Sequence, residues 1–168
     1  MHKPAILITG ASGEIGTKLI ESLKDKKDIQ IITLDLNKLD SSISQLVTNE
    51  ITGNILDTDL LDQLNGEYQF KTIYHLAALL STRAEFAPMV AHDVNVGGTL
   101  NLLNLAYKQG LSQGTQIKFF FPSSIAIYGL KNIQEKVSAG AIKENCYKNP
   151  YTIYGCNKLS CEHLGNYY

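Results

Sequence analysis

Short apolar runs alternate along the chain with segments in which apolar residues recur at helical spacing. Five runs predict β-strands, at Ala5–Thr9, Ile29–Leu34, Leu46–Thr52, Thr72–Leu76 and Ile117–Phe121. Apolar residues are continuous within these runs rather than alternating with polar ones, which is typical of strands buried on both faces. The pattern therefore favours a parallel sheet that is covered by helices on both sides.

The segments between the strands predict the helices. Helical spacing is found in Glu14–Lys24, in Asp57–Leu64 with Asp57 or Thr58 as the cap, in Ala91–Lys108, and from Asn149-Pro150 to the end of the chain. The segment Leu130–Asn149 is expected to be irregular. Strands that alternate with helices through right-handed crossovers give an α/β, doubly wound sheet, with 3-2-1-4-5 as the natural strand order.

A glycine-rich loop, TGASGEIG over residues 9–16, joins the first predicted strand to the first predicted helix. Gly10 permits a tight turn, Gly13 removes a side chain where a pyrophosphate would approach, and Gly16 lets the helix pack closely on the sheet. Free N–H groups at the start of the helix can then hold the phosphates. Three glycines at this spacing predict a dinucleotide site, the alternative being a glycine-rich turn that binds no ligand.

An acidic residue, Asp35, follows the second predicted strand. A carboxylate at this place can accept hydrogen bonds from both adenosine ribose hydroxyls and repels a 2′-phosphate. Leu36 and Asn37 come next instead of Arg or Lys. We therefore expect NAD rather than NADP as the cofactor, the alternative for Asp35 being a solvated strand end.

Two further groups suit proton transfer. Tyr154 and Lys158 are four residues apart, which puts them on one face of the last helix. An adjacent ammonium group is expected to lower the pKa of the phenol and make it a general acid or base. Ser123 and Ser124 follow the fifth strand, at the sheet edge where ligands of such folds bind. The alternatives are a surface pair for Tyr154 and Lys158, and a cap or turn role for either serine.

Charge and composition exclude several classes of function. The formal net charge is -1, and Arg83 is the one arginine among 15 basic residues, so a nucleic-acid surface is not expected. No apolar run approaches the roughly 20 residues of a membrane span. The three cysteines lack a CxxC motif and are expected to be free thiols in a cytoplasmic protein. The histidines lack ligand spacing, so no metal site is expected.

Taken together, these motifs resemble the extended branch of the short-chain dehydrogenase/reductase superfamily, the NAD-dependent epimerase/dehydratase family. The resemblance is carried by TGASGEIG (9–16), HLAA (75–78), NVGGTLNLL (95–103), PSSIAIYG (122–129) and YGCNK (154–158). It implies a Rossmann sheet and an oxidoreductase that acts on a secondary alcohol, with hydride passing to NAD.

The resemblance also implies roles for individual residues. Tyr154 would be the catalytic acid/base, Lys158 would hold the nicotinamide ribose and tune Tyr154, and Ser124 would orient the substrate oxygen. Asn54 stands where the family usually has an aspartate that touches adenine, and Asn95 is similar to a structural asparagine of the family. The expected cofactor-binding residues are Gly10, Ser12, Gly13, Glu14, Ile15, Gly16, Asp35, Asn54, Ile55, Leu76, Ala77, Ala78, Asn95, Tyr154 and Lys158.

Within the family, HLAALLS, PSSIAIYG and TIYG are most similar to the L-threonine 3-dehydrogenase-like branch. That resemblance would place Ser81, with Ser124, against the substrate. Epimerase, dehydratase and dehydrogenase activities all stay open, as do a sugar nucleotide or a hydroxy amino acid as the small-molecule substrate. His75 is expected to be a packed strand residue.

The length of 168 residues fits one ordinary domain. Members of the extended branch are about twice as long, so the resemblance implies an NAD-binding Rossmann domain over residues 1–168, truncated before the substrate-binding part. A non-catalytic NAD-binding module and an inactive fragment are therefore alternatives to an active enzyme. The helices Ala91–Lys108 and Thr152–Tyr168 are expected to pair across a homodimer, as they often do in the family.

Overall fold

The computed structural model describes residues 4–26 and 28–168 of the chain. These residues form two compact units. The first unit runs to Ala78 and includes Gly98–Pro122, and the second consists of Leu79–Gly97 and Ser123–Tyr168.

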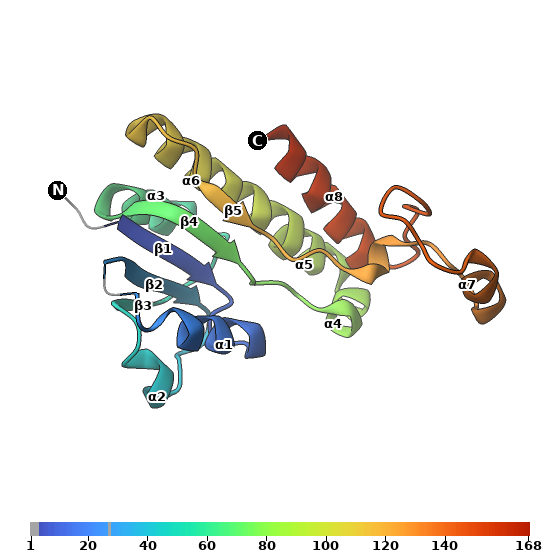
Figure 1. Cartoon of the computed structure of the whole chain (residues 1–168), viewed down its shortest axis with the longest axis horizontal. Coiled ribbons are helices and arrows are strands. Elements are labelled where there is room, and N and C mark those ends of the chain that lie inside the picture. The colour runs from blue at the N-terminus through green and yellow to red at the C-terminus, as the bar shows by residue number, and fades with distance from the viewer. Residues whose placement is uncertain (1–3, 27) are drawn as a thin grey trace. The chain divides into compact units, whose positions relative to one another are not determined.

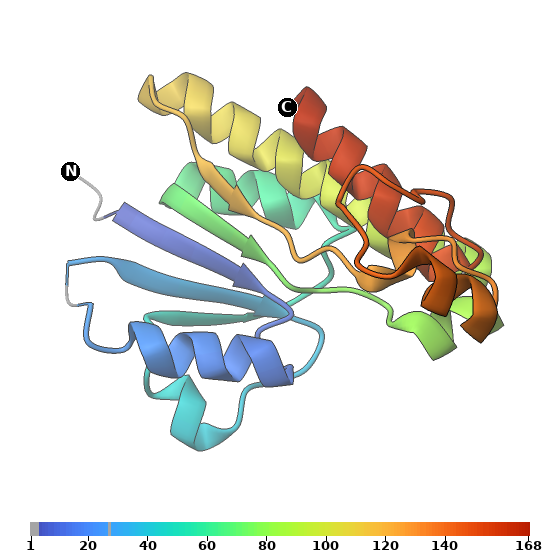
Figure 2. The same ribbon diagram turned by 45° about the vertical axis from the view of Figure 1, so that its right-hand side comes forward.

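The first unit is built on a five-stranded sheet in the order β3-β2-β1-β4-β5 (Figures 1 and 2). All four strand pairs are parallel. The strands are β1 (Pro4–Thr9), β2 (Gln30–Asp35), β3 (Asn49–Thr52), β4 (Gln69–His75) and β5 (Lys118–Phe120). The predicted doubly wound parallel sheet and its strand order 3-2-1-4-5 are confirmed.

Helices cover the two faces of this sheet. Helices α1 (Glu14–Leu23) and α2 (Ser41–Ser44) lie on one face, and α3 (Thr58–Glu67) and α6 (Gly98–Gln113) lie on the other (Figure 2). The predicted cap at Asp57 is confirmed, because its carboxylate accepts a hydrogen bond of 3.0 Å from the Leu60 N–H. The short helix α2 was not expected, since it lies between the second and third strands in a segment without helical periodicity.

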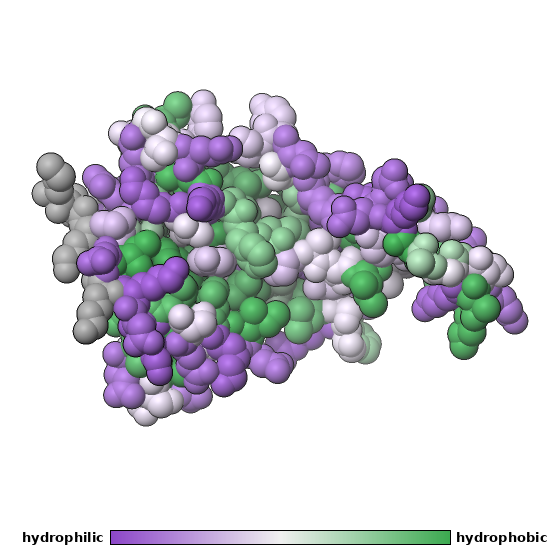
Figure 3. Space-filling model, in the orientation of Figure 1, coloured by the Kyte–Doolittle hydropathy of each residue, from purple (hydrophilic) through white to green (hydrophobic). Residues whose placement is uncertain are grey.

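The core lies under the centre of the sheet, whereas its β4–β5 side is covered on one face only. Ile6 and Ile8 of β1 are buried in one cluster with Ile20 of α1. On β5, by contrast, Phe120 is 51% exposed and its ring touches the half-buried Tyr74 of β4, with centroids 5.7 Å apart. Apolar residues gather over this sheet face in Figure 3. The expectation that every strand is buried on both faces is therefore wrong for β4 and β5.

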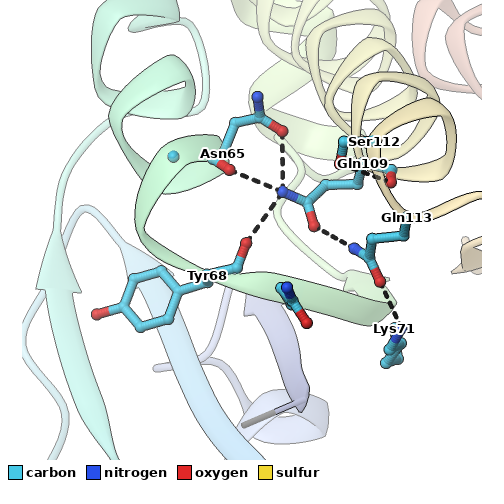
Figure 4. A pocket seen from close by; sticks show the side chains of 8 residues that line it. Asn65, Tyr68, Lys71, Gln109, Ser112 and Gln113 are labelled. Atoms are coloured by element: carbon cyan, nitrogen blue, oxygen red, sulfur yellow. Dashed lines mark hydrogen bonds between the residues drawn. The ribbon is translucent and has the colours of Figure 1, made fainter. Parts of the chain in front are cut away.

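A polar pocket lies where β4 begins, at the sheet edge opposite the glycine loop (Figure 4). Its centre is Gln109 of α6, whose side chain is 2% exposed. The Gln109 amide donates to the main-chain oxygens of Asn65 and Tyr68 and accepts from the Phe70 N–H, over 2.9–3.0 Å. Because these polar groups are hydrogen-bonded to one another, we interpret the cluster as a structural link between α6, α3 and β4.

The second unit is made of helices and loops. These are α4 (Ser81–Phe86), α5 (Pro88–His92), the π-helix η1 (Asp93–Gly97), the 3₁₀-helix η2 (Ile125–Ile127), α7 (Ile133–Ala139) and α8 (Ile153–Tyr167). The predicted long helix over Ala91–Lys108 is thus interrupted by a π-turn. The segment expected to be irregular contains α7, and α4 was not expected at all.

The last helix starts later than the Asn149-Pro150 signal indicated. The Thr152 hydroxyl accepts a 3.0 Å hydrogen bond from the Gly155 N–H, so Thr152 is the N-cap and α8 begins at Ile153. Its four-residue spacing of Tyr154 and Lys158 is unchanged, and both side chains belong to the first two turns of the helix.

Candidate functional site

The glycine loop has the tight turn that its sequence predicts. Gly10 has φ +67, a conformation that side chains disfavour. A Cβ on Gly10 would lie 2.5 Å from the Ala77 nitrogen, and a Cβ on Gly16 would lie 2.6 Å from the Ala11 oxygen. Both glycines are therefore required by the packing of the chain itself, where β1 turns into α1 beside the end of β4.

Gly13 differs from the other two glycines of the loop. It is exposed, and a Cβ on it would meet one atom, the Gly10 oxygen, at 3.3 Å. Gly13 is the N-cap of α1, and no side chain of the described residues caps that helix end. The first turn, which carries Glu14 and the 64% exposed Ile15, thus offers N–H groups without helical partners. The space at Gly13 fits a phosphate group of a dinucleotide.

Asp35 is held against this loop. One carboxylate oxygen accepts from the Ser12 N–H and the other from the Asn37 N–H, each over 2.9 Å. The structure thus brings Asp35, Ser12 and the glycine turn together, as the spacing predicted. Each oxygen keeps a lone pair that can accept from a ribose hydroxyl.

The residues after β3 have structural contacts of their own. The Asn54 side-chain oxygen accepts a 3.0 Å hydrogen bond from the Leu56 N–H. Ile55 is 5% exposed, and its side chain fills the space above Gly98 of α6. Its main-chain oxygen accepts from the Asn101 amide over 3.1 Å. The side chain of Ile55, which the sequence predicted to bind the cofactor, therefore belongs to the core.

The residues after β4 lie at the same end of the sheet as the glycine loop. The Leu76 N–H donates to the Thr9 oxygen over 3.0 Å, and the Ala77 N–H donates to the Thr9 hydroxyl over 3.4 Å. Ala77 and Ala78 are half-buried. The small side chain of Ala77 stands directly beside Gly10, at the place where the loop turns.

In the second unit, Tyr154 and Lys158 lie on one face of α8. The Lys158 ammonium nitrogen is 5.6 Å from the centre of the Tyr154 ring. Lys158 is 4% exposed, and Tyr154 is half-buried. A phenol and an amine placed this close together are the kinds of groups that transfer protons in active sites.

The pKa values of this pair differ from the expectation. Burial raises the pKa of the Tyr154 phenol, whereas the sequence predicted that the neighbouring ammonium would lower it. Burial also lowers the pKa of the Lys158 ammonium, and an electrostatic interaction with Cys161 opposes that shift. Burial disfavours the charged form of both groups, and it is the largest cause of each of the two pKa shifts.

Ser124 begins the 3₁₀-helix η2 and is its N-cap. Its hydroxyl oxygen accepts from the Ala126 N–H over 3.1 Å. The cap role, which the sequence left as the alternative, is therefore present, and the hydroxyl proton can still be donated to a ligand. Ser123 is used differently, since its hydroxyl donates to the Glu162 carboxylate.

Gly155 is a residue that the sequence reasoning missed. A Cβ on Gly155 would lie 2.2 Å from the Ala126 oxygen. The first turn of α8 can therefore approach η2, whose N-cap is Ser124, only because residue 155 has no side chain. A glycine directly after Tyr154 inside a helical pattern was the signal that could have identified this contact.

Asn95 joins the π-helix η1 to the chain that follows Ala78. Its amide accepts from the Leu79 N–H over 2.8 Å and donates to the Leu79 oxygen over 3.0 Å. The main-chain oxygen of Asn95 also accepts from the Cys161 thiol of α8 over 3.2 Å. Asn95 is 3% exposed, and these contacts make it a structural residue of the second unit.

Ser81 is the first residue of α4 and is exposed. Helix α4 also supplies Glu85, whose carboxylate accepts from the Tyr154 N–H over 3.4 Å. A second contact that the sequence did not indicate joins His92 of α5 to Asn157 of α8 over 3.1 Å. These contacts tie both helices to the helix that carries Tyr154.

Two absences hold for residues 4–26 and 28–168. No helix there has both the length and the apolar character needed to cross a bilayer. No cluster of three or more His, Cys, Asp or Glu side chains there could hold a metal ion.

The site residues thus divide between the two units. Those expected to bind the nucleotide lie on a doubly wound parallel sheet of the dinucleotide-binding type, and those expected to transfer a proton lie on α8 and η2. A profile of the family described as GDP-mannose 4,6 dehydratase matches residues 7–168. The chain belongs to this family.

Individual relatives agree with this family. A Staphylococcus epidermidis protein described as an uncharacterized epimerase/dehydratase is 34% identical over 97% of this chain and 48% of its own length. A monomeric L-threonine 3-dehydrogenase from a metagenome has a TM-score of 0.80 and 34% identity over 97% of this chain and 48% of that one. UDP-glucose 4-epimerase from Thermotoga maritima, with a TM-score of 0.80 and 24% identity over 97% of this chain and 50% of that one, shows the fold alone.

The resemblance to epimerase/dehydratase proteins inferred from the sequence is therefore confirmed. The chain spans about half the length of the curated relatives it matches. The individual roles assigned to site residues remain predictions.

Proposed function

We propose that this chain binds NAD and forms the cofactor half of an oxidoreductase that acts on a secondary alcohol. The observation that carries the proposal is the loop at the start of α1. Gly13 leaves space there that the chain does not fill, and the Asp35 carboxylate is fixed beside it by the Ser12 N–H. These residues fit a dinucleotide.

In this proposal the first turn of α1 donates its N–H groups to the pyrophosphate. Asp35 accepts from the adenosine ribose hydroxyls, and its charge repels the 2′-phosphate of NADP. Asp35 is followed by Leu36 and Asn37, neither of which is a cation. The loop should therefore prefer NAD over NADP.

Bound NAD would supply the hydride acceptor. Tyr154 takes the proton from the oxygen of the substrate hydroxyl, and the hydrogen on the carbon that bears this hydroxyl would leave as hydride to NAD, so that the alcohol becomes a carbonyl. The positive charge of Lys158 favours the phenolate form of Tyr154 and opposes the effect of burial. The Ser124 hydroxyl donates a hydrogen bond to the substrate oxygen.

A titration followed by one substitution tests this assignment. Calorimetry should show binding of NAD and weaker binding of NADP to the wild type. Tyr154→Phe should leave NAD binding unchanged and abolish turnover, because the ring keeps its shape and loses the proton. Full turnover by Tyr154→Phe would exclude Tyr154 as the acid/base, and failure of NAD to bind would exclude the cofactor.

For the substrate we propose a hydroxy amino acid such as L-threonine, with a sugar nucleotide as the second candidate. The similarity to a structure described as L-threonine 3-dehydrogenase, at 34% identity, supports the first candidate. The family profile of a GDP-mannose dehydratase supports the second. NADH formation with L-threonine, compared with product analysis for UDP-glucose and GDP-mannose, separates them.

A second candidate function is a non-catalytic NAD-binding module. It is favoured by the burial that raises the pKa of the Tyr154 phenol, because a phenol that keeps its proton cannot take the proton of a substrate hydroxyl. Assaying the chain with and without the polypeptide that follows Tyr168, where one exists, distinguishes the two. Binding of NAD without turnover in both assays supports the module.

We also propose a homodimer that uses α6. Leu100, Tyr107 and Leu111 are 39%, 54% and 67% exposed and share one stripe of that helix by their spacing. An apolar stripe of this kind suits helix-to-helix association. Sedimentation of the purified chain tests it, and a monomer at high concentration excludes it.

A further inference from the structure

A chain of hydrogen bonds crosses the first unit beneath the glycine loop. Its centre is His75, the last residue of β4, which is 1% exposed. The Nδ1 atom of His75 is 2.8 Å from the Thr9 hydroxyl of β1, and the Nε2 atom is 3.0 Å from the Thr99 hydroxyl of α6. The Thr9 hydroxyl also accepts from the Ala77 N–H over 3.4 Å.

The direction of this chain follows from its hydrogen atoms. The Ala77 N–H can only donate, so the Thr9 oxygen accepts from it. Of the two groups that the described structure places within hydrogen-bonding distance of the Thr9 hydroxyl, the Ala77 N–H cannot accept a proton, whereas Nδ1 of His75 can. Nδ1 is then unprotonated, and the ring proton lies on Nε2, which donates to Thr99. The arrangement selects one tautomer of neutral histidine.

The same contacts fix the place where the glycine loop turns. Thr9 directly precedes Gly10, and the nitrogen of Ala77 is the atom that a Cβ on Gly10 would approach to 2.5 Å. The rings of Phe119 and Phe121 lie 6.1 and 6.0 Å from the His75 ring. The imidazole is thus held from β5 as well as by its hydrogen bonds, so it fixes the ends of β1 and β4 relative to α6.

We propose that His75 is a positioning residue for the pyrophosphate of a bound dinucleotide. As a neutral imidazole with its proton on Nε2, it holds the Thr9 hydroxyl and through it the Ala77 amide beside Gly10. The inference rests on the proposed function, in that the ligand of the loop is a dinucleotide. It assigns a role to a histidine that takes no part in proton transfer.

The tautomer can be measured on the wild type without any substitution. Nitrogen-15 NMR of histidine-labelled protein at pH 7 should show His75 with a protonated Nε2 and an unprotonated Nδ1. A proton on Nδ1, or on both nitrogens, would overturn the inference. This measurement needs no ligand and no active enzyme.

A pair of matched variants tests the positioning role. Thr9→Val keeps the shape of residue 9 and removes both hydrogen bonds of its hydroxyl. Thr33→Val is the control, because Thr33 of β2 is 1% exposed and its hydroxyl has no hydrogen-bond partner within the described part of the chain. Both are buried threonines of adjacent parallel strands.

The probes are NAD and adenosine, at a temperature where each variant is folded. Thr9→Val should weaken NAD binding about tenfold and adenosine binding less than twofold, because adenosine has no pyrophosphate. Thr33→Val should change neither. An equal loss for both probes, or no loss for NAD, would overturn the positioning role. A wild type that binds no NAD overturns the proposed function and the inference together, whereas the wrong tautomer with intact NAD binding overturns the inference alone.

Discussion

At the scale of single residues, the three glycines of the loop are required for different physical reasons. Gly10 and Gly16 lack side chains because main-chain atoms of the protein stand within 2.6 Å of where a Cβ would be. The nearest atom to a Cβ on Gly13 is 3.3 Å away. Packing therefore accounts for the first two glycines, and the proposed dinucleotide would account for the third.

This difference predicts that one alanine variant loses stability and the other loses NAD binding. Gly16→Ala should lower the free energy of unfolding by about 2 kcal/mol or more, because the methyl group overlaps main-chain atoms. Gly13→Ala should cost less than about 1 kcal/mol and weaken NAD binding at least tenfold. Urea unfolding and calorimetry measure the two effects. A Gly13→Ala protein that binds NAD as the wild type does would show that no phosphate approaches this residue.

Lys158 predicts a pH dependence of stability. Burial lowers the pKa of its ammonium group in the folded protein, so between that pKa and about 10.5 the unfolded chain binds more protons. The contribution of Lys158 to stability therefore grows as the pH rises through this window, by at most about 1.4 kcal/mol per pH unit, and is lost as the pH falls. Lys158→Met should remove this slope.

The measurement is urea unfolding of both proteins at pH 7, 8, 9 and 10. The difference in unfolding free energy between wild type and Lys158→Met isolates Lys158, because other groups titrate in both proteins. A difference that stays constant over this range would contradict a lowered pKa.

At the scale of elements, helix α8 depends on how closely its first turn approaches η2. A Cβ on Gly155 would lie 2.2 Å from the Ala126 oxygen. A Cβ on Gly165 of the same helix would meet nothing within 4 Å. Two glycines of one helix thus form a natural pair for comparison.

Gly155→Ala should destabilise the protein by about 1–3 kcal/mol and lower any turnover, because α8 must move away from the segment that carries Ser124. Gly165→Ala should be neutral or stabilise by up to about 1 kcal/mol, since alanine favours a helix interior. Thermal unfolding of both variants checks the prediction. Equal effects at the two positions would mean that helix propensity alone explains Gly155.

Elements with periodic patterns could be predicted from the sequence, and elements held by tertiary contacts could not. The continuous apolar run of β1 and the periodicity of α1 identified both. The π-turn at Asn95 follows from its hydrogen bonds to Leu79 and Cys161, which no local pattern reveals. The spacing of Tyr154 and Lys158 could be recognised in the sequence. The direction of their pKa shifts could not, because it depends on how deeply the folded chain buries them.

At the scale of the whole molecule, the sheet of the first unit has one face uncovered at β4 and β5. Phe119 and Phe120 are adjacent on β5 and point to opposite faces. The ring of Phe119 packs near His75, and Phe120 is 51% exposed. Parallel sheets are normally covered on both faces, so we predict that this apolar face takes part in association.

Adjacent substitutions separate the two faces. Phe119→Ser should lower the unfolding free energy by about 3 kcal/mol, because it opens a cavity beside the buried histidine. Phe120→Ser should change stability by less than about 1 kcal/mol and reduce binding of a hydrophobic dye and self-association. Chemical unfolding and light scattering measure these effects. Unchanged dye binding in Phe120→Ser would mean that the apolar surface that binds the dye lies elsewhere.

The backbone of the same strand has a separate consequence. Within the part of the chain that the structure describes, β5 is the outer strand of the sheet and pairs with β4; it is three residues long and starts at Lys118. A short edge with a lysine is a poor template for the strand-by-strand growth that leads to fibrils. We therefore expect the side chains of β5 to contribute to association, and its peptide groups to contribute little to fibril growth.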